Sequence, residues 1–554
     1  MEMYLKKPIA LACAGLLAFV VNAQESQRKV VLHGSVQSDV LIPEEDKDIN
    51  TGSYDDWGLT NTYVDLNLMS KNVEAGARLE FTEYPLPGFE NDFQGWGVPH
   101  IYIKGISDFG FDVTVGDFYD QFGSGFIFRT YEERSLGIDN ALRGARLNVT
   151  ALKGVQFKVL GGLQRRYWDW KHGAWVGGAD LEVNLEQYSR GMQDKGITWM
   201  VGASGVLKQE GDEDILVSGT NYRLNLPRSV GAFDVRSRFQ KGDYSVMAEY
   251  AWKSQDPSFD NGYIYRRGSA LMLSASYSKR GASALVQVKR SEDMSFRSQR
   301  SMNGISAFVN NMPAFAYQHT YALPALYPYA TQAADGEWAF QGEFGYTFKR
   351  RTPLGGKYGT KLKLNVSHIR GLGKDPVATF HGETMGTDGY KTKFFKMDGL
   401  YYQDINVQLE KKLTKAFKLN LMYMNQRYNQ TVIEGEGGTI KSNIGVAEGK
   451  YQFNNKLTLR AEVQYLATKQ DEGDWTYGLL ELSVLPYFMF TVSDMWNNGA
   501  TDLHYYMGSV TFNYKSHRLM AGYGRTRAGY NCSGGVCRFV PASRGVQVSY
   551  NYNF

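Results

Sequence analysis

The feature that most constrains this fold is a pattern of about ten residues in which apolar and polar side chains alternate. Residues 73–82, 244–252, 337–348 and 457–465 show the pattern clearly, and their polar positions include charges or amides. Alternation with a period of two places one set of side chains on each face of a β-strand. A soluble sandwich could contain single segments of this kind, but their repetition along the whole chain favours one large sheet.

The connections between these segments form a second pattern, because short polar turns alternate with long loops. Such asymmetry is typical of outer-membrane barrels, which have short periplasmic turns and long extracellular loops. The sequence therefore predicts an all-β, transmembrane, antiparallel outer-membrane β-barrel of about 24 strands, within a range of about 20 to 26. The twelve expected loops are 41–60, 85–97, 119–141, 166–172, 208–229, 254–267, 292–335, 370–399, 427–442, 468–474, 495–504 and 527–543.

A barrel of this kind must close on itself, because lipid offers no partner for an unpaired backbone group. Polar alternates then face the lumen, and aromatic residues at strand ends form girdles at the membrane interfaces. The candidates for these girdles are Tyr84, Trp252, Phe348, Trp475 and Tyr514.

The first 23 residues are predicted to be a cleaved signal peptide. Lys6 and Lys7 precede an apolar core at 9–21, and small residues at 21–23 provide a cleavage site. Cys13 lies within the core and leaves lipidation as an alternative. We expect residues 24–554 to form one barrel domain. The first strand, expected at 29–40, follows the cleavage site too closely for an N-terminal plug domain, so energised import of the type that uses such a plug is not expected.

Two cysteines remain after export, Cys532 and Cys537, separated by Ser-Gly-Gly-Val. In an oxidising compartment, the expected state is a disulfide that closes a loop tip. Two free thiols are the alternative. A metal site would need more ligands, and the nearest histidine is His517.

A barrel of about 24 strands is wide enough for an aqueous lumen unless something fills it. One candidate filler is the stretch 116–147, which is rich in charge. Folded inward, opposed acidic and basic rows would focus a field across a pore and select polar solutes. The alternative is solvated loop charge with local ion pairs. The charged candidates are Asp117, Asp120, Arg129, Glu132, Glu133, Arg134, Asp139, Arg143 and Arg146.

The second candidate filler is the stretch 310–332, within the longest loop, which is unusually apolar and contains three prolines. Such a surface usually packs against the lumen wall, a neighbouring loop or a partner protein. We favour packing within the protein over partner binding. The residues concerned include Phe315, Tyr317, Tyr321, Leu326, Tyr327 and Tyr329.

The chain ends on a strand pattern, RGVQVSYNYNF at 544–554, with an aromatic terminal residue. It resembles the terminal strand of bacterial outer-membrane barrels. That resemblance implies that Tyr550, Tyr552 and Phe554 belong to the signal read by the barrel-assembly machinery. Because the alternating connections place this end on the periplasmic side, the strand should pair with the first strand and close the barrel.

Two stretches carry a more specific resemblance, GSGFIFRTYEERSLGIDNALRGARL and YALPALYPYATQ. They resemble segments of an uncharacterised family of Bacteroidota outer-membrane β-barrel proteins with a domain of unknown function. The resemblance implies the barrel fold and the outer membrane of a Gram-negative cell. It brings no activity and no site residues.

No motif indicates an enzyme. The eight histidines are scattered, GxSxG and HExxH do not occur, and the loop carboxylates lack calcium-loop spacing. We therefore expect no catalytic site, metal or cofactor, and the net charge of +4 gives no reason to expect nucleic-acid binding.

The leading interpretation is a passive, porin-like channel for small polar solutes, narrowed by inward-folded loops. The alternative is a non-catalytic structural or accessory subunit of a multiprotein outer-membrane assembly, secretion or transport complex. Expected partners are outer-membrane lipid, the barrel-assembly machinery during insertion and, for the alternative, other outer-membrane proteins.

Overall fold

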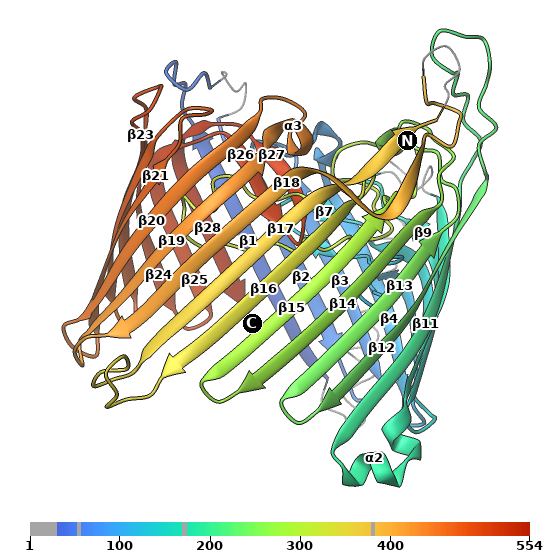
Figure 1. The fold of residues 1–554 in the computed structure, drawn as a ribbon, viewed down its shortest axis with the longest axis horizontal. Coiled ribbons are helices and arrows are strands. Elements are labelled where there is room, and N and C mark those ends of the chain that lie inside the picture. Colours follow the sequence, from blue (N-terminus) through green and yellow to red (C-terminus); the bar gives the residue numbers. More distant parts are fainter. Residues whose placement is uncertain (1–29, 52–56, 169–173, 378–382) are drawn as a thin grey trace.

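The computed structural model describes residues 30–51, 57–168, 174–377 and 383–554; the expected signal peptide lies outside these ranges. The described residues form a sheet of 24 antiparallel strands that closes into a barrel (Figure 1). Each barrel strand pairs with its neighbours in chain order, and the last strand pairs with the first, with Tyr552 opposite Val36. The predicted fold class is confirmed. Closure pairs both edges of the sheet, as lipid requires.

The barrel strands follow one another along the chain. The first twelve are β1 (Val31–Pro43), β2 (Leu59–Met69), β3 (Val73–Thr82), β4 (Gly95–Ser107), β5 (Phe111–Phe118), β8 (Leu142–Val149), β9 (Val155–Gln164), β10 (Trp175–Asn184), β11 (Ile197–Gln209), β12 (Ser229–Lys241), β13 (Tyr244–Lys253) and β14 (Gly268–Lys279). The other twelve are β15 (Ala282–Glu292), β16 (Glu337–Phe348), β17 (Thr360–Pro376), β18 (Tyr390–Lys412), β19 (Phe417–Asn429), β20 (Thr439–Gln452), β21 (Leu457–Ala467), β22 (Trp475–Val484), β23 (Phe488–Asn497), β24 (His504–Tyr514), β25 (His517–Thr526) and β28 (Ser543–Asn553).

The remaining elements are short and belong to connections. Two hairpins lie within loops, β6 (Glu132–Glu133) with β7 (Ile138–Asp139), and β26 (Gly529–Ser533) with β27 (Val536–Val540). The helical segments are η2 (Asn91–Phe93), η3 (Leu185–Tyr188), α2 (Arg190–Asp194), η4 (Phe259–Asn261) and α3 (Gln430–Ile433). In the described ranges, no helix has the length and apolar character needed to cross a membrane.

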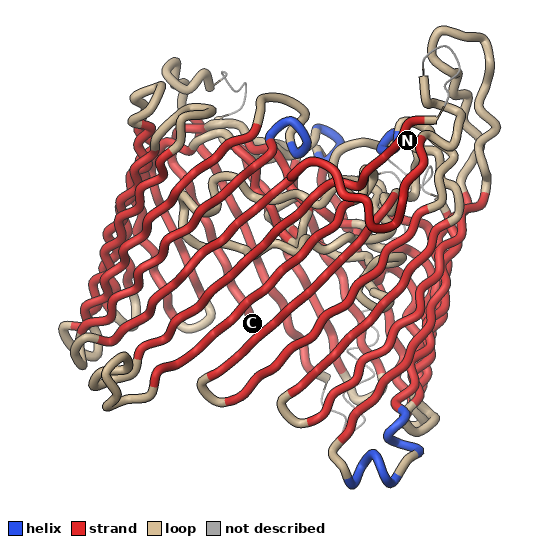
Figure 2. The backbone as a smooth tube through the Cα atoms, viewed as in Figure 1, coloured by secondary structure: helices blue, strands red, loops and turns tan. Residues whose placement is uncertain are grey.

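The connections alternate as predicted, with eleven turns at one end of the barrel and twelve loops at the other (Figure 2). The main departure is at β17 and β18, which extend into the expected loop at 370–399. Their pairing continues there through register shifts that begin between Ile369 and Arg370. The polar character of this stretch predicted a loop. Beyond the membrane, however, water accommodates polar side chains on both faces of a strand, so the pairing can continue.

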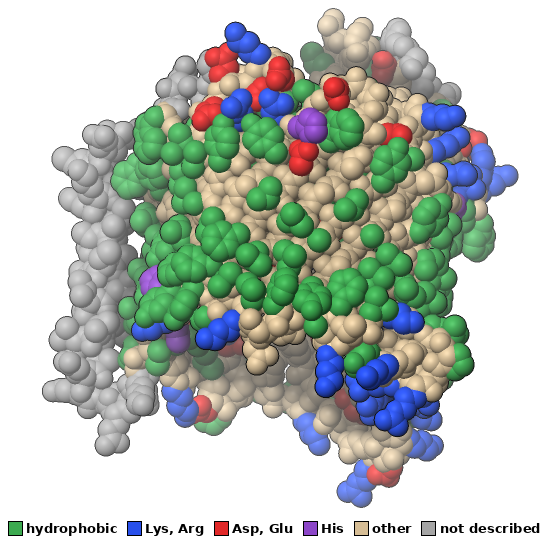
Figure 3. All heavy atoms as spheres, turned by 90° about the vertical axis from the view of Figure 1, so that its left-hand side faces the viewer, with side chains coloured by type: hydrophobic (Ala, Val, Ile, Leu, Met, Phe, Trp, Pro, Cys, Tyr) green, Lys and Arg blue, Asp and Glu red, His purple; other side chains and the backbone are tan. Residues whose placement is uncertain are grey.

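The two faces of the strands divide as the alternation predicted. In β13, Val246 and Tyr250 are exposed on the outer wall, whereas Glu249 faces the interior and is 1% exposed. In β21, the exposed Val463 stands next to the buried Gln464. Figure 3 shows a band of hydrophobic side chains across the lower part of one side of this wall and further groups above it, with Lys and Arg gathered below the band. The outer surface is thus suited to lipid.

The expected aromatic girdle is correct in part. Tyr84 and Tyr514 are exposed at strand ends, but the prediction for Trp475 is wrong because this side chain is fully buried. Trp475 pairs across β21 and β22 with Leu466, which is also buried, and its ring lies 6.0 Å from that of Tyr505. A strand alternates faces at every residue, so the face of one aromatic residue depends on the strand register.

The closing seam contains the three residues of the expected assembly signal. Tyr550, Tyr552 and Phe554 occupy alternate positions, and the Tyr552 and Phe554 rings stack with centroids 5.4 Å apart. The amide of Phe554 donates to the carbonyl of Gly34, and the amide of Gly34 donates back, both at 3.0 Å. The chain end is therefore tied into the barrel beside the first strand.

Candidate functional site

Two extracellular loops fold into the barrel. The first forms the central part of the candidate stretch 116–147, whose ends belong to β5 and β8, and the second contains the candidate stretch 310–332. We call residues 119–141 and 293–336 together the loop plug. Phe122, Phe126 and Phe128 of the first loop are fully buried in one apolar cluster with Phe315 and Leu323 of the second. The same cluster includes side chains from strands of the barrel wall, from β5 to β22. The apolar core of this protein thus lies inside the lumen.

The two loops of the plug interlock through their backbones. The amide of Arg129 donates to the carbonyl of Val309 at 2.8 Å, and the amide of Asn311 donates to that of Gly125 at 3.0 Å. The Asn310 side chain donates to the carbonyl of Phe126 at 2.7 Å. Buried backbone groups need partners, and each loop supplies them for the other. We therefore treat the plug as one structural unit.

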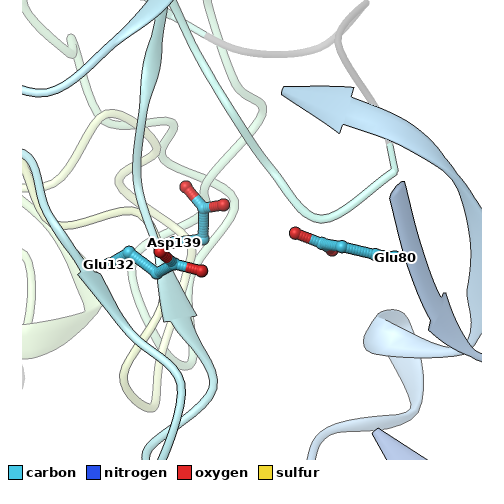
Figure 4. Close-up of side chains that lie close together, drawn as sticks. All are labelled: Glu80, Glu132 and Asp139. Atoms are coloured by element: carbon cyan, nitrogen blue, oxygen red, sulfur yellow. The ribbon is translucent and has the colours of Figure 1, made fainter. Parts of the chain in front are cut away.

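Arginines anchor the first loop to the barrel wall. Arg78 of β3 lies 2.8 Å from Glu80 and 2.6 Å from Glu132, and it also contacts Asp139. Arg165, just after β9, lies 3.0 Å from Glu80 and also contacts Asp139. Figure 4 shows the carboxylates of Glu80 and Glu132 pointing toward each other, with Asp139 beside Glu132. Two side chains from the loop and one from the wall are thus held by shared cations.

These three carboxylates form an anion cluster with metal-like spacing, since an oxygen of each lies within 4.8 Å of the others. Arg78 and Arg165 are almost fully buried among them and supply the positive charge that a metal would bring. Burial alone would raise the pKa of Asp139, but the two guanidinium groups outweigh it and lower the pKa to about 2. Burial raises the pKa of Glu132 above its ordinary value, although Arg78 opposes this. The cluster therefore anchors the first loop of the plug to the barrel wall.

The other predicted charges of the stretch 116–147 also have partners, but three of them, Asp117 on β5 and Arg143 and Arg146 on β8, belong to the barrel wall and not to a loop as expected. The residues already introduced, Glu132 and Asp139, bind Arg78. Further contacts are Arg134 with Asp65 (2.8 Å) and Glu132 (2.6 Å), Asp120 with Arg146 (3.2 Å) and Lys158 (2.8 Å), Arg143 with Asp117 (2.8 Å), Glu133 with the hydroxyls of Ser135 (2.7 Å) and Ser533 (3.2 Å), and Arg129 over the Tyr131 ring (4.6 Å).

These pairs change the interpretation of the charged loop. We expected either opposed rows of charge across a pore or a solvated loop with local ion pairs. The loop is folded inward, and Asp120, Glu132, Arg134 and Asp139 form ion pairs with residues of the wall. Glu133 is bound by two hydroxyls and Arg129 lies over the Tyr131 ring. Opposed rows of free charge are thus not the arrangement found in the described residues. The charged side chains of this loop thus mainly fix its position in the lumen.

The second candidate filler, residues 310–332, is called the aromatic loop. It is anchored mainly by hydrogen bonds to the part of the barrel wall opposite the anchor of the first loop. The amide of Tyr317 donates to Ser367 of β17 at 3.0 Å, and the amide of Leu323 donates to Gln464 of β21 at 2.8 Å. Additional contacts run from Tyr321 to Glu448 (3.3 Å), from Tyr327 to Asp471 (2.8 Å) and from Tyr329 to Glu337, while Phe315, Leu326, Tyr327 and Tyr329 are buried. The structure places this loop within the protein and not at an exposed docking surface.

The disulfide-bonded hairpin clamps both loops of the plug. Cys532 and Cys537 are joined as predicted, in the hairpin of β26 and β27. Its tip residue, Gly535, has a positive φ of 93° and accepts a hydrogen bond from the amide of Thr331 at 3.0 Å. A Cβ at this position would lie 2.6 Å from the Thr331 hydroxyl and 2.8 Å from the amide nitrogen of Ala314. Glycine is therefore required for this close approach.

Sequence reasoning missed the residues that receive the loops. Arg78 stands at a polar position of an alternating segment, which marked it as lumen-facing, but nothing in the pattern pointed to Asp139 as its partner. The Gly-Gly pair between the cysteines indicated a tight turn, although not that its tip would contact Ala314 and Thr331. These contacts join segments far apart in the sequence.

The lumen wall is covered unevenly by the plug. On β17 to β21, lumen-facing Ser367 and Gln464 are buried to 1% exposure or less. On β24 and β28, lumen-facing Ser509, Gln547 and Ser549 remain partly exposed. We call β23, β24, β25, β28 and β1 the open wall. The side chains of Ser509, Gln547 and Ser549 are therefore less covered by the loop plug than those of Ser367 and Gln464, although Thr511 on the same wall is buried.

These observations define the class of protein. A closed antiparallel barrel with an apolar outer wall, short turns at one end and long loops at the other is a transmembrane barrel of the outer-membrane type. The chain belongs to a family of unknown function, DUF6029, whose profile matches residues 5–554. This match agrees with the expected uncharacterised domain, whereas a Bacteroidota source stays a prediction. No curated protein matches the chain.

The chain is also similar to solved barrel structures. A mutant of the ferric enterobactin receptor PfeA from Pseudomonas aeruginosa has 11% identity and a TM-score of 0.43, with 96% of this chain and 81% of that chain covered. The P pilus usher (PapC) translocation pore has 9% identity and a TM-score of 0.43, with 95% and 99% covered. OccAB3 from Acinetobacter baumannii has 9% identity and a TM-score of 0.34, with 95% and 99% covered. These similarities carry no inference about function.

Proposed function

We propose that this outer-membrane barrel is a passive diffusion channel for small polar solutes. In this proposal the loop plug narrows the lumen, and the solute passes along the open wall. The observation that carries the proposal is the contrast in burial between Ser367 on the covered wall and Ser509 on the open wall.

The chemistry of the open wall suggests which solutes would pass. Its lumen-facing side chains include Ser493, Ser509, Gln547 and Ser549, with hydroxyl and amide groups. Charges of both signs stand among them, namely Asp39 on β1, Asp65 beside Ser35 of β1, and the exposed Arg518 on β25. Asp39 accepts a hydrogen bond from Ser549 at 2.6 Å. Hydroxyl and amide groups can replace part of the hydration of an uncharged polar solute. We therefore expect neutral, hydrogen-bonding solutes to be favoured over strongly charged ones.

The accessory-subunit alternative receives less support. It required either the aromatic loop or the disulfide hairpin as a docking surface. The aromatic loop lies in the lumen, and the hairpin tip is engaged by Thr331 and Ala314. In a channel, the aromatic loop narrows the lumen and the disulfide hairpin holds it, so both features fit the positions in which they lie.

Ion conductance in planar bilayers tests the proposal. The wild-type protein is compared with a variant in which residues 314–330 are replaced by two glycines. This shortening is feasible because the amide of Ala314 and the hydroxyl of Thr331 both lie close to Gly535, and therefore to each other. We expect a small wild-type conductance that rises severalfold in the variant, since part of the plug is removed.

The control removes residues 216–223, the tip of an extracellular loop outside the plug. Its ends are also close, because Leu216 and Arg223 form an antiparallel bridge. This deletion should leave the conductance unchanged. A folded wild-type barrel that stays silent would contradict the proposal, and so would equal conductance increases in both deletions.

A further inference from the structure

The barrel end with the short turns carries a strongly basic sector. Four successive connections, β14–β15, β16–β17, β18–β19 and β20–β21, lie side by side because the strands pair in chain order. Residues 277–284, 345–363, 407–420 and 449–460 contain fifteen Lys and Arg but only one carboxylate, Glu410. We call these fifteen cations the basic arc. The whole chain has a formal charge of +4, so everything outside these four stretches sums to −10.

Among the described residues, Lys361, Lys418 and Arg460 form ion pairs, Arg460 with Glu448, Glu462 and Glu481, and the other twelve cations of the arc have no carboxylate within ion-pair distance. Glu410 lies 3.4 Å from Lys361 and 2.9 Å from Lys418, so two members of the arc already share it. Arg350, Arg351 and Lys357 are exposed, and none has a carboxylate within ion-pair distance in the described part of the chain. A patch of like charges of this size attracts anions.

Exposed apolar side chains stand on the same turns as these cations. Leu354, Leu413 and Phe453 are 64%, 46% and 55% exposed, respectively. The turns adjoin the apolar outer wall, and Figure 3 shows Lys and Arg side chains gathered just below hydrophobic ones. Cations beside exposed apolar groups match a membrane interface, where the cations meet phosphates and the apolar groups enter the acyl region. A soluble acidic partner would require the charge but not the exposed leucines.

We propose that the basic arc binds the headgroups of anionic phospholipids. The short turns of an outer-membrane barrel face the periplasm, so the lipids belong to the periplasmic leaflet. Arg350, Arg351 and Lys357 contact the phosphates, while Leu354 and Leu413 lie among the first carbons of the acyl chains. This site is separate from the lumen and does not depend on the channel proposal.

Lipid retention measured by native mass spectrometry tests the assignment. The purified barrel in a neutral detergent is titrated with phosphatidylglycerol and, separately, with phosphatidylcholine. The test variant combines Arg350→Gln, Arg351→Gln and Lys357→Gln. We expect the wild type to prefer phosphatidylglycerol, and the variant to lose that preference by at least roughly tenfold, because each interfacial cation contributes to binding.

The control variant combines Arg190→Gln, Lys195→Gln and Lys241→Gln. It removes the same charge from the same end of the barrel but outside the arc, and it should keep the wild-type preference. All six side chains are exposed and lie in the connections between strands or at a strand end, and heat-modifiable migration on gels verifies that each variant is folded.

Three outcomes would overturn the proposal. If both variants lose the preference equally, the effect is general surface charge and not the arc. If millimolar inorganic phosphate competes for the bound lipid as effectively as added phosphatidylglycerol does, the arc is a site for free anions. If polyglutamate binds the arc and the lipid preference stays unchanged after the arc is neutralised, the occupant is an acidic protein segment.

Discussion

Replacing Asp139 with asparagine should release the loop plug from the barrel wall. Asp139 is held by Arg78 and Arg165, and it accepts hydrogen bonds from the hydroxyl of Tyr119 at 2.9 Å and the amide of Ala141 at 3.2 Å. Asparagine keeps the size of the side chain and can still accept hydrogen bonds, but it removes the charge.

The structure gives the expected magnitude. Breaking a buried ion pair by removing one partner costs about 3–5 kcal/mol, because it leaves an uncompensated buried charge. Here Arg78 keeps Glu80 and Glu132, and Arg165 keeps Glu80, so we expect the lower end, about 3 kcal/mol. If this loss falls on local opening of the plug, protected amides within it should exchange roughly 150-fold faster.

Hydrogen exchange detected by mass spectrometry measures this effect at the amides of Arg129 and Asn311, which join the two loops. The control is Asp108→Asn. Asp108 forms an ion pair with Lys71 at 2.8 Å, but both side chains are exposed and the pair lies at the opposite end of the barrel. Such a pair contributes about 0–1 kcal/mol and should not affect the plug. Unchanged exchange at both amides in Asp139→Asn would refute the anchoring role.

Three further predictions concern pH, the disulfide and assembly. Because the pKa of Asp139 is lowered in the folded protein, the stabilising contribution of this carboxylate is complete above its ordinary pKa of 3.8 and is lost only as pH falls toward 2. The difference in hydrogen exchange between wild type and Asp139→Asn should therefore be the same at pH 7 and about pH 5. A difference that disappears by about pH 5 would contradict this prediction. Replacing Cys532 and Cys537 with serine removes the closure of a short loop, worth about 2 kcal/mol, so the amide of Thr331 should exchange roughly 30-fold faster; an unchanged rate would show that the hairpin is held by its contacts alone. Phe554→Ala should lower the amount of folded protein in the outer membrane, measured by heat-modifiable migration, whereas Phe539→Ala in the exposed hairpin should not; equal levels would argue against the terminal signal.

The barrel itself could be predicted from the sequence because lipid and water impose opposite requirements on neighbouring residues. That requirement is local, so the positions of most strands and the bounds of the loop at 119–141 followed from the pattern. Trp475 shows the limit. Its place at a strand end suggested the membrane interface, but the register of β22 directs it into the lumen.

The arrangement inside the lumen could not be predicted in the same way. Whether Asp139 is solvated or buried depends on Arg78 and Arg165, and their proximity follows from barrel closure and loop folding. The aromatic loop was expected to pack within the protein because exposed aromatic surface is unfavourable, but its partners on β17 and β21 could not be identified. The local sequence thus indicates that the apolar side chains of a loop must be buried, whereas contacts between segments far apart in the sequence determine which residues bury them.

The most direct test of the channel is the accessibility of single cysteines in the lumen. Ser509→Cys places a thiol on the open wall, and Ser367→Cys places one on the wall covered by the loop plug. A charged methanethiosulfonate reagent is added to each variant in a planar bilayer while ion current is recorded. We predict that the current falls for Ser509→Cys and is unaffected for Ser367→Cys. A fall for Ser367→Cys alone, or no current in either folded variant, would contradict a passage along the open wall.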